Sequence, residues 1–588
     1  MNKLKVLALS CIICITGYGQ VDMNQLGFYS NAPKSAAVIA DPKVKEFKIV
    51  TEKGKEVYKG KLTEPVHSKN SSLTVCQADF STFTKTGRYR LVAGKQQSGL
   101  FTIGDNVFSD VSKAVLKAFY YQRVSEPLLP KYAGRWARPA GHPDTLVQVH
   151  PSAVTPQRPA GTVIRSPGGW YDAGDYNKYI VNSGITTATL LSAYEDFPQY
   201  YQQLTVNIPE TGNGVPDILN EILYNLRWML TMQDPNDGGV YHKCTNASFD
   251  GMVMPGVTKA PRYVVQKSTA AALDFTAVMA QATRVFSTFS KELPGLSDSC
   301  LLAAKQSWNW ALQNPNVIYN QYAMNNHFKP AIVTGSYGDD RLNDEWFWAA
   351  TEMFATTLDP IYKTKAEEYK SNDWQIPNWS QVYMLGIYTM QRIGDQDFST
   401  IPFQNSKGEM TDGNGILAMA DNLVASISTN AFGVVMGQNR SDFNWGSNSL
   451  AANQGVLLIQ AYRMTQDEKY LDAALTNVDY LLGKNATGYC FVTGFGSKSV
   501  MHPHHRPSVA DGIEDPIPGL LSGGPNPGRE DKCTYPFTEP ETAYVDVSES
   551  YASNEIAINW NAPAVYLFNA IEAEQKAISN HLLKRDIE

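Results

Sequence analysis

The sequence predicts two domains of different class: a small all-β sandwich, followed by a large all-α domain in which paired helices close into a ring. Between Val21 and Ile103 the apolar runs are short or alternate with polar residues, which is typical of strands. Near Asp105 apolar residues begin to recur at three and four positions, the helical period. Roughly a dozen such helices follow with no strong strand period between them, which favours a closed ring.

Residues 1–19 have the pattern of an export signal. Basic residues precede the apolar run Val6 to Ile15, and small residues follow up to Gly19. This run is shorter than the roughly 20 residues that span a bilayer, so we expect cleavage near Gly19. A lipid anchor on Cys11 stays open as an alternative. We expect an exported protein in the periplasm or at the cell surface of a bacterium, with no transmembrane segment.

Residues 20–104 form the predicted β-sandwich. Turn signals such as Lys53-Gly54 and Thr86-Gly87 separate its strands. The expected strands are Ser35 to Ile39, Phe47 to Thr51, Val57 to Leu62, Ser72 to Ala78, Arg88 to Val92 and Gly99 to Ile103.

Residues 105–588 form the predicted all-α domain, joined by long Gly/Pro-rich and aromatic loops of the kind that carry function. The expected helices are Val111 to Gln122, Thr186 to Tyr194, Pro216 to Met232, Ser268 to Phe286, Asp298 to Leu312, Asp344 to Ala355, Trp379 to Arg392, Ile416 to Ser426, Ser449 to Met464, Glu468 to Leu482 and Asn554 to Ala573. In a ring the first and last of these are neighbours.

Composition narrows the class of ligand. The formal net charge of −7 argues against nucleic acid, which selects a basic face. Aromatic residues make up 11% of the chain and suit a neutral, flat ligand such as a sugar. The cysteines that follow the signal are scattered without CxxC spacing, which predicts buried free thiols rather than a disulfide framework or a zinc ribbon.

The segment GGWYDAGDYNKY, residues 168–179, places two carboxylates beside aromatic side chains. Asp172 and Asp175 are separated only by small residues, so a tight turn can direct both into one space. Trp170 and Tyr171 lie next to them and are candidates for contacts with a sugar ring. The same segment also fits a surface turn whose aspartates cap a helix starting near Tyr176.

A third carboxylate lies in the segment DVSESYASNEIAINWNA, residues 546–562. Glu555 is followed by apolar residues, which would favour its protonated form through desolvation, and we expect it to act as a general acid. An ordinary first-turn glutamate that interacts with a helix dipole is the alternative. Hydrolysis of a glycosidic bond needs such an acid together with a second, ionised carboxylate.

A histidine cluster lies in the segment TGFGSKSVMHPHHRP, residues 493–507. His504 and Arg506 alternate along a predicted extended segment, so both can donate hydrogen bonds to sugar hydroxyls on one face. Two alternatives stay open. His502, His504 and His505 could ligate zinc, although a spaced fourth ligand is missing, or the segment could be a solvated loop.

These three clusters, in this order and spacing, resemble glycoside hydrolase family 9, the inverting cellulase family. The segment with Asp172 and Asp175 is similar to that family's motif for the nucleophilic water. Tyr544, Asp546, Tyr551, Glu555, Ala557, Asn561 and Ala562 fit its acid-bearing signature, and Thr493, Gly496, Lys498, Pro503, His504 and Arg506 fit its histidine signature, from which Cys490 departs. The start of the mature chain, VDMNQLGFYSNAPKSAAV, looks like the immunoglobulin-like module of one branch.

The resemblance implies an immunoglobulin-like sandwich followed by an (α/α)6 barrel, with an open cleft for β-1,4-glucan. It implies that Asp175 is the general base, Asp172 its helper on the water and Glu555 the general acid. His504 and Arg506 become ligands of sugar hydroxyls, and Trp560 flanks the acid. An inverting enzyme keeps its two carboxyl groups about 6.5–9.5 Å apart, which leaves room for water.

The resemblance implies no required cofactor. Many members of this branch hold zinc near the first catalytic loop, but Arg123-Val124 and Val149-His150-Pro151 lack the expected cysteines, so we expect no zinc. Structural calcium stays open near Lys267 to Thr276, where Ser268 and Asp274 are present but Leu273 stands where an acid is frequent. We expect a monomer.

Our leading hypothesis is an endo-acting glucanase on cellulose-like, mixed-linkage or xyloglucan chains. The alternative is an exo-acting cellobiohydrolase, β-glucosidase or glucosaminidase on short oligosaccharides, because the loop Asp511 to Asp531 could block one end of the cleft. A sugar-binding protein without catalysis is disfavoured by the three intact acids. A polysaccharide lyase is disfavoured because it would use a Tyr or His base.

Overall fold

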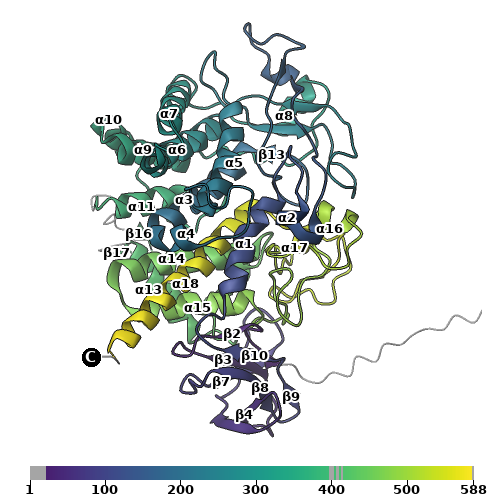
Figure 1. Ribbon diagram of the computed structural model, residues 1–588, viewed down its shortest axis with the longest axis vertical. Helices are drawn as coiled ribbons and strands as arrows, with labels where there is room; N and C mark the ends of the chain where they lie inside the picture. Colours follow the sequence, from purple (N-terminus) through teal and green to yellow (C-terminus); the bar gives the residue numbers. More distant parts are fainter. Residues whose placement is uncertain (1–20, 396–402, 405–409, 412–414, 586–588) are drawn as a thin grey trace, which may run out of the picture.

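The computed structural model describes residues 21–395, 403–404, 410–411 and 415–585 (Figure 1). The predicted export signal, residues 1–19 with Cys11, lies outside the described residues. Within the described part, no helix is both long and apolar enough to cross a membrane. Four of the five cysteines there are buried, and all five are free, as expected from their spacing.

The chain begins with a sandwich of two sheets. Its strands are β1 (Val21–Asp22), β2 (Gly27–Phe28), β3 (Ser35–Ile39), β4 (Glu46–Thr51), β5 (Glu56–Lys61), β6 (Val66–His67), β7 (Thr74–Asp79), β8 (Gly87–Ala93), β9 (Gln96–Gln97) and β10 (Phe101–Ile103). One sheet has the order β1-β3-β7-β6, and the other has the order β2-β10-β8-β4-β5 with β9 on β8. Phe28, Phe47, Phe80 and Phe101 pack between the sheets. The predicted strands match the structure to within two residues at each end.

The helical domain is a ring of paired helices. Its main helices are α1 (Ser109–Tyr121), α3 (Ile180–Asp196), α5 (Asp217–Thr231), α6 (Thr269–Phe286), α7 (Leu296–Gln313), α9 (Asn343–Thr357), α10 (Pro360–Glu368), α11 (Tyr383–Arg392), α13 (Gly415–Ile427), α14 (Ser447–Thr465), α15 (Glu468–Leu481) and α18 (Ile558–Arg585). The pairs α3 with α5, α6 with α7, α9 with α10 and α14 with α15 pack side by side. Between pairs, α3 packs on α6, α6 on α9, α9 on α11 and α14 on α18.

The first and last helices are neighbours, as a ring requires. Helix α18 packs against both α1 and α3 and crosses the domain in Figure 1. Helices α3, α6, α9 and α14 are buried on nearly all sides, as expected for an inner layer. Each outer partner instead exposes one face, for example α7 and α15.

Sequence reasoning missed α10. It is short and polar, and Ala366 is its only described buried residue, so it has little apolar periodicity. The residues at the start of α10 nevertheless have the pattern of a helix N-terminus. Pro360 lies at the first helical position, and the Asp359 side chain accepts a hydrogen bond from the Ile361 amide, which is a standard helix start.

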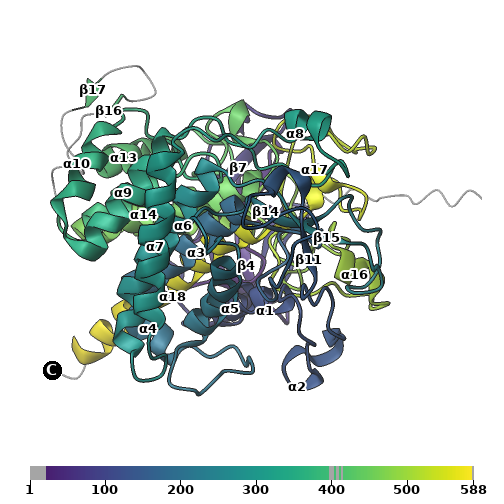
Figure 2. The same ribbon diagram turned by 90° about the horizontal axis from the view of Figure 1, so that it is seen from above.

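The prediction that the chain stays helical after residue 105 is wrong in two places, one of which is the short pair β16 (Phe403–Gln404) and β17 (Met410–Thr411). A sheet with the order β12-β11-β15-β14-β13 lies inside this domain. Its strands are β11 (Val147–Val149), β12 (Val163–Ile164), β13 (Lys178–Tyr179), β14 (Lys243–Asn246) and β15 (Arg262–Val264). Strands this short carry almost no periodic signal. Seen from above in Figure 2, this sheet and the short helices α16 (Arg506–Ala510) and α17 (Tyr551–Asn554) lie together on one side of the helices.

The sandwich packs on the helical domain through polar contacts. The Asn24 amide donates to the Asp479 carboxylate on α15 at 2.9 Å. The Gln25 side-chain oxygen accepts from the backbone amides of Ser497 and Lys498, both at 2.8 Å. The two domains therefore share buried hydrogen bonds, and Gln25 reaches the segment that leads to His504.

We expect Asn24→Ala to destabilise the protein by about 1–3 kcal/mol, because it removes the donor to a buried carboxylate. Calorimetric melting measures the effect as a lower unfolding temperature. Asn106→Ala, at an exposed position, serves as the matched control and should melt with the wild type. Equal melting temperatures for both variants would contradict a stabilising contact between the domains.

Candidate active site

A cleft of about 970 Å³ opens on the side of the helical domain where the loops gather. It brings together Asp172, Asp175, Glu555, His504, Arg506 and Trp560, which are written far apart in the sequence. The described residues that line it also include Phe249, Tyr337, Trp379, Trp445 and Tyr551. The wall therefore combines several aromatic side chains with a few convergent polar groups, the composition of a sugar site.

The loop before α3 presents two aspartates whose carboxylates accept defined hydrogen bonds. Asp172 accepts from the Asn182 amide at 2.6 Å and from the Tyr337 hydroxyl at 2.8 Å. Asp175 accepts from Asn177 and from the Tyr179 hydroxyl, both on Oδ2. No hydrogen bond to Asp175 Oδ1 is found among the described residues, so this oxygen is the one available to a water molecule.

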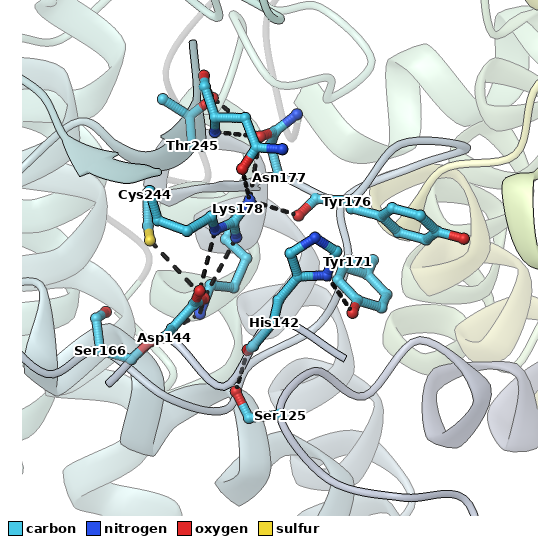
Figure 3. Close-up of polar contacts among 12 residues, drawn as sticks. Ser125, His142, Asp144, Ser166, Tyr171, Tyr176, Asn177, Lys178, Cys244 and Thr245 are labelled. Atoms are coloured by element: carbon cyan, nitrogen blue, oxygen red, sulfur yellow. Dashed lines mark hydrogen bonds and ion pairs between the residues drawn. The ribbon is translucent and has the colours of Figure 1, made fainter. Parts of the chain in front are cut away.

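A buried ion cluster holds this loop from behind (Figure 3). Asp144 pairs with Lys178 at 2.7 Å and with Arg262 at 3.0 Å, and the charges of these two cations lower the pKa of Asp144 to about 2. Figure 3 shows Lys178 and Cys244 directed at Asp144, with Asn177 next to Thr245. The Lys178 ammonium also donates to the Gly168 carbonyl. The turn that carries the aspartates is thus fixed at its base.

Glu555 lies before the last helix rather than in it. The predicted helix Asn554 to Ala573 begins only at Ile558, because residues 555–557 are extended and pair with other loops. Glu555 pairs with His504, and Ala557 pairs with Ala173. The Ile558 amide donates to the Asp172 carbonyl at 2.8 Å. Backbone hydrogen bonds therefore link the segment carrying the acid to the aspartate loop.

Gly174 lies where these segments meet. The Arg506 amide donates to its carbonyl at 3.2 Å, and an added Cβ at residue 174 would lie 2.1 Å from the His504 carbonyl oxygen. Only glycine allows this close approach of the two backbones. The small residue Gly174, between Asp172 and Asp175, thus allows the two chain segments to pack closely as well as directing the two carboxylates.

Burial raises the pKa of two of the three acids, Asp172 and Glu555. Burial and the neighbouring charge of Asp175 raise the pKa of Asp172 to about 8, although Asn182 and Tyr337 oppose the shift. Burial, with the charges of Asp175 and Asp172, raises the pKa of Glu555 well above its usual value, and Arg506 offsets part of this. Glu555 is therefore held protonated near neutral pH, which is the form a proton donor needs.

The other predicted sugar ligands also line the cleft. The His504 imidazole shares a hydrogen bond of 2.6 Å between Nδ1 and the Ser548 carbonyl, so Nε2 is the ring nitrogen left for a ligand. The Arg506 guanidinium donates to the carbonyls of Asp250 and Gly174 and is nearly buried. Trp560 lies on α18 and packs closely on Gly446.

Trp170 and Tyr171 differ from the expectation that they contact a sugar. Both side chains are fully buried and lie outside the set of residues that line the cleft. Trp170 packs on Phe119 with ring centroids 4.6 Å apart, and the Tyr171 hydroxyl bonds to His142 Nδ1 at 2.8 Å. Their backbone enters the loop from the core side, so their rings point inward and support the turn.

Several cleft residues were missed from the sequence. Tyr337 reaches Asp172 from a loop 165 positions away. Trp379 was assigned to the start of a helix, but α11 begins at Tyr383 and Trp379 lies in the preceding loop. Phe249 and Trp445 are 47% and 44% exposed on the cleft wall, an unusual exposure for large aromatics that suits ring stacking. In the sequence, a glycine next to an aromatic residue, as at Tyr337 and Trp445, was the feature that could have indicated these cleft positions.

The structure does not favour the alternative zinc site at His502, His504 and His505. His505 Nε2 bonds to the Gln122 side chain at 2.9 Å while His504 bonds to Ser548, so these rings serve different partners. In the described ranges, no group of three or more His, Cys, Asp or Glu side chains is placed to hold a metal ion. Arg123, which stands in a pair where the family resemblance would place a zinc-binding cysteine, is fully buried in ion pairs with Glu126, Glu210 and Glu221.

Comparison with known proteins agrees with this geometry. Residues 108–568 match Glycosyl hydrolase family 9, and residues 17–98 match the Cellulase N-terminal ig-like domain. The chain is 46% identical to the Xyloglucan-specific endo-beta-1,4-glucanase of Bacteroides ovatus over 94% of both chains. It is 33% identical to Endoglucanase D of Acetivibrio thermocellus over 93% of this chain and 82% of that protein.

The fold agrees as well. A solved structure of Bacteroides ovatus GH9 superposes with a TM-score of 0.88 at 44% identity, covering 94% of this chain and 99% of that one. The family match spans most of the chain and includes all three acids of the cleft. With the acids, the helical ring and the sandwich all in agreement, the chain belongs to glycosyl hydrolase family 9.

Proposed function

We propose that this protein is an endo-acting β-1,4-glucanase that hydrolyses xyloglucan with inversion at the anomeric carbon. The observation that carries the proposal is one aromatic cleft that holds Asp172, Asp175 and Glu555. The relative with 46% identity is a xyloglucan-specific endo-beta-1,4-glucanase, which supports the substrate. None of the described residues lining the cleft comes from the loop Asp511 to Asp531, which supports an open groove over a blocked pocket.

The three acids divide the chemistry of hydrolysis. Asp175 accepts a proton from a water molecule through its free Oδ1, and Asp172 helps to orient that water. The water oxygen forms a bond to the anomeric carbon on the face opposite the leaving group. The bond from that carbon to the glycosidic oxygen breaks, and Glu555 gives its proton to that oxygen. The carboxyl separation of about 6.5–9.5 Å that inversion needs stays a prediction.

The cleft walls bind the glucan backbone. His504 Nε2 is placed to accept from a sugar hydroxyl, because Nδ1 donates to the Ser548 carbonyl, and the unused Nη2 of Arg506 is placed to donate to one. Trp560 lines the cleft beside the acid. Trp445 and Tyr551 lie with ring centroids 5.4 Å apart and offer a broad apolar platform for pyranose faces.

Glu555→Gln should lower kcat by about 10²–10⁴-fold, the usual contribution of a general acid. The wild-type rate should fall as the pH rises through the raised pKa of Glu555, because the deprotonated form cannot donate. Glu549→Gln, an exposed neighbour, is the matched control. Proton NMR of the fresh product should show the α-anomer first, and either full activity of the Gln variant or a β-anomeric product would contradict the mechanism.

The substrate and mode of attack can be tested together. On soluble xyloglucan we expect viscosity to drop well before reducing sugar accumulates, because an endo-acting enzyme cuts inside the chain. Rates across xyloglucan, mixed-linkage glucan and a soluble cellulose derivative should rank xyloglucan first. Steady sugar release without thinning would indicate the exo-acting alternative, and a higher rate on the undecorated chain would contradict the proposed substrate.

We also propose a structural calcium ion near Asp274, within the segment where the sequence left calcium open. Both carboxylate oxygens of Asp274 and of Glu345, and one of Asp339, are buried without a hydrogen-bond partner. Burial and mutual repulsion raise the pKa of Asp274 and Glu345 well above their usual values. Hard oxygen ligands of this kind suit calcium. The carboxylates are not already arranged as a ligand shell, so they would have to converge on the ion.

Calcium should raise the melting temperature, since a ligand at about 100 times its Kd adds about 2.7 kcal/mol to the free energy of unfolding. Calorimetry with calcium, with magnesium and with EDTA measures this. Magnesium should have less effect because it requires a stricter geometry. Asp274→Asn should lose most of the calcium dependence, and a wild type that melts identically in calcium and EDTA would contradict the site.

We propose further that the protein is exported and acts as a monomer. The basic residues and apolar run at its start support export.

A further inference from the structure

Two consecutive buried residues lie behind the catalytic aspartates without lining the cleft. Lys243 is the first residue of β14 and His242 precedes it, and both are fully buried. Tyr179, on the neighbouring strand β13, is the register partner of Lys243. The Lys243 ammonium lies 5.4 Å from the centre of the Tyr179 ring. Lys243 is thus a buried cation that interacts with the carboxylates of Asp175 and Asp172.

Both side chains hold the same loop. The Lys243 ammonium donates to the Gly335 carbonyl and to Thr334 Oγ1 at 3.1 Å, and also to Gln321 Oε1 at 2.6 Å. His242 Nε2 lies 2.9 Å from the Ser336 carbonyl. A carbonyl can only accept, so Nε2 carries the proton, and Nδ1 accepts from Ser268 Oγ at 2.9 Å.

The loop 334–337 requires stabilising contacts. Gly335, Ser336 and Tyr337 all line the cleft. Tyr337 has a φ of 47°, in the left-handed region that a residue with a large side chain rarely adopts. The Gly335 amide donates to the Tyr179 hydroxyl at 3.1 Å, so the loop also contacts the tyrosine that bonds to Asp175.

The loop supplies the hydroxyl donor of one aspartate and contacts the hydroxyl donor of the other. The Tyr337 hydroxyl donates to Asp172 at 2.8 Å, and the Tyr179 hydroxyl donates to Asp175 at 3.1 Å. The two rings pack with centroids 4.8 Å apart. A shift of the loop would therefore move the donors of Asp172 and Asp175 together.

Charge adds to this geometry. Burial lowers the pKa of Lys243 to about 7, while the carboxylates of Asp175 and Asp172 raise it in part. The aromatic groups that face the ammonium are Tyr179 and Tyr319. Burial lowers the pKa of His242 to about 3, so its imidazole is neutral. Lys243 is thus a cation that favours the ionised form of Asp172, and His242 contributes hydrogen bonds alone.

We propose that His242 and Lys243 are positioning residues, which fix the loop 334–337 so that the hydroxyls of Tyr337 and Tyr179 stay on the two aspartates. This role rests on the proposed hydrolytic function. It requires no contact between either residue and the substrate.

The kinetic test compares Lys243→Met with Lys243→Arg. The Met variant should lower kcat about 10²-fold with little change in KM, since small misplacements of reacting groups cost about that much. Loss of the nearby cation should also move the acid limb of kcat/KM to higher pH. The Arg variant keeps the charge and should hold that limb at its wild-type position while recovering part of kcat.

A matched control separates positioning from general loss of stability. Lys34 is also fully buried and donates to loop carbonyls of Ser30 and Ala32, but it lies in the sandwich. Lys34→Met should lower the melting temperature without changing the pH profile. If Lys243→Met does not fold, His242→Leu tests the same loop and should lower kcat without moving the acid limb, because His242 is neutral.

A structural readout does not depend on turnover. A crystal structure of Lys243→Met, or of His242→Leu, should show the Tyr337 hydroxyl displaced from Asp172. An unchanged contact, or unchanged kcat with an unmoved acid limb, would overturn the positioning role. A wild type that hydrolyses no β-glucan would instead overturn the proposed function, and the structural comparison would still decide whether these residues fix the loop.

Discussion

Repulsion among buried carboxyl groups is the constraint on which the active site depends. Asp172, Asp175 and Glu555 share one cleft with largely apolar walls, and each charge there makes the next one more costly. The surrounding groups distribute that cost unequally. Hydrogen bonds from Asn182 and Tyr337 offset part of the rise in the pKa of Asp172, while Glu555 keeps its proton. The arrangement thus yields one proton acceptor and one proton donor at the same pH.

Chain packing makes this crowding possible. The acids come from separate loops, and backbone hydrogen bonds, together with the Arg506 side chain, hold those loops together. Pairing of Ala173 with Ala557, and of His504 with Glu555, brings the segments into register. Gly174 allows the closest approach. The helical ring contributes by placing α18 next to α3, so that the loops before these two helices meet.

The sequence was informative where chemistry is local and periodic. The strands of the sandwich, most of the ring and the three acids followed from patterns in the sequence and from the family resemblance. The orientation of Trp170 and Tyr171 did not, because an aromatic beside an acid has the same sequence whether its ring faces the core or the cleft. The contact of Tyr337 depends on a left-handed backbone and on tertiary packing, neither of which has a period. The short strands β11–β15 were hidden for the same reason.

The contact of Gln25 gives the sandwich a role beyond its own fold. Its side chain accepts hydrogen bonds from Ser497 and Lys498, a few residues before His504. The sandwich therefore supports, from outside the cleft, the segment that leads to His504. Sequence changes at this seam can alter how firmly glucan is held, even though no residue of the sandwich is among the described residues that line the cleft.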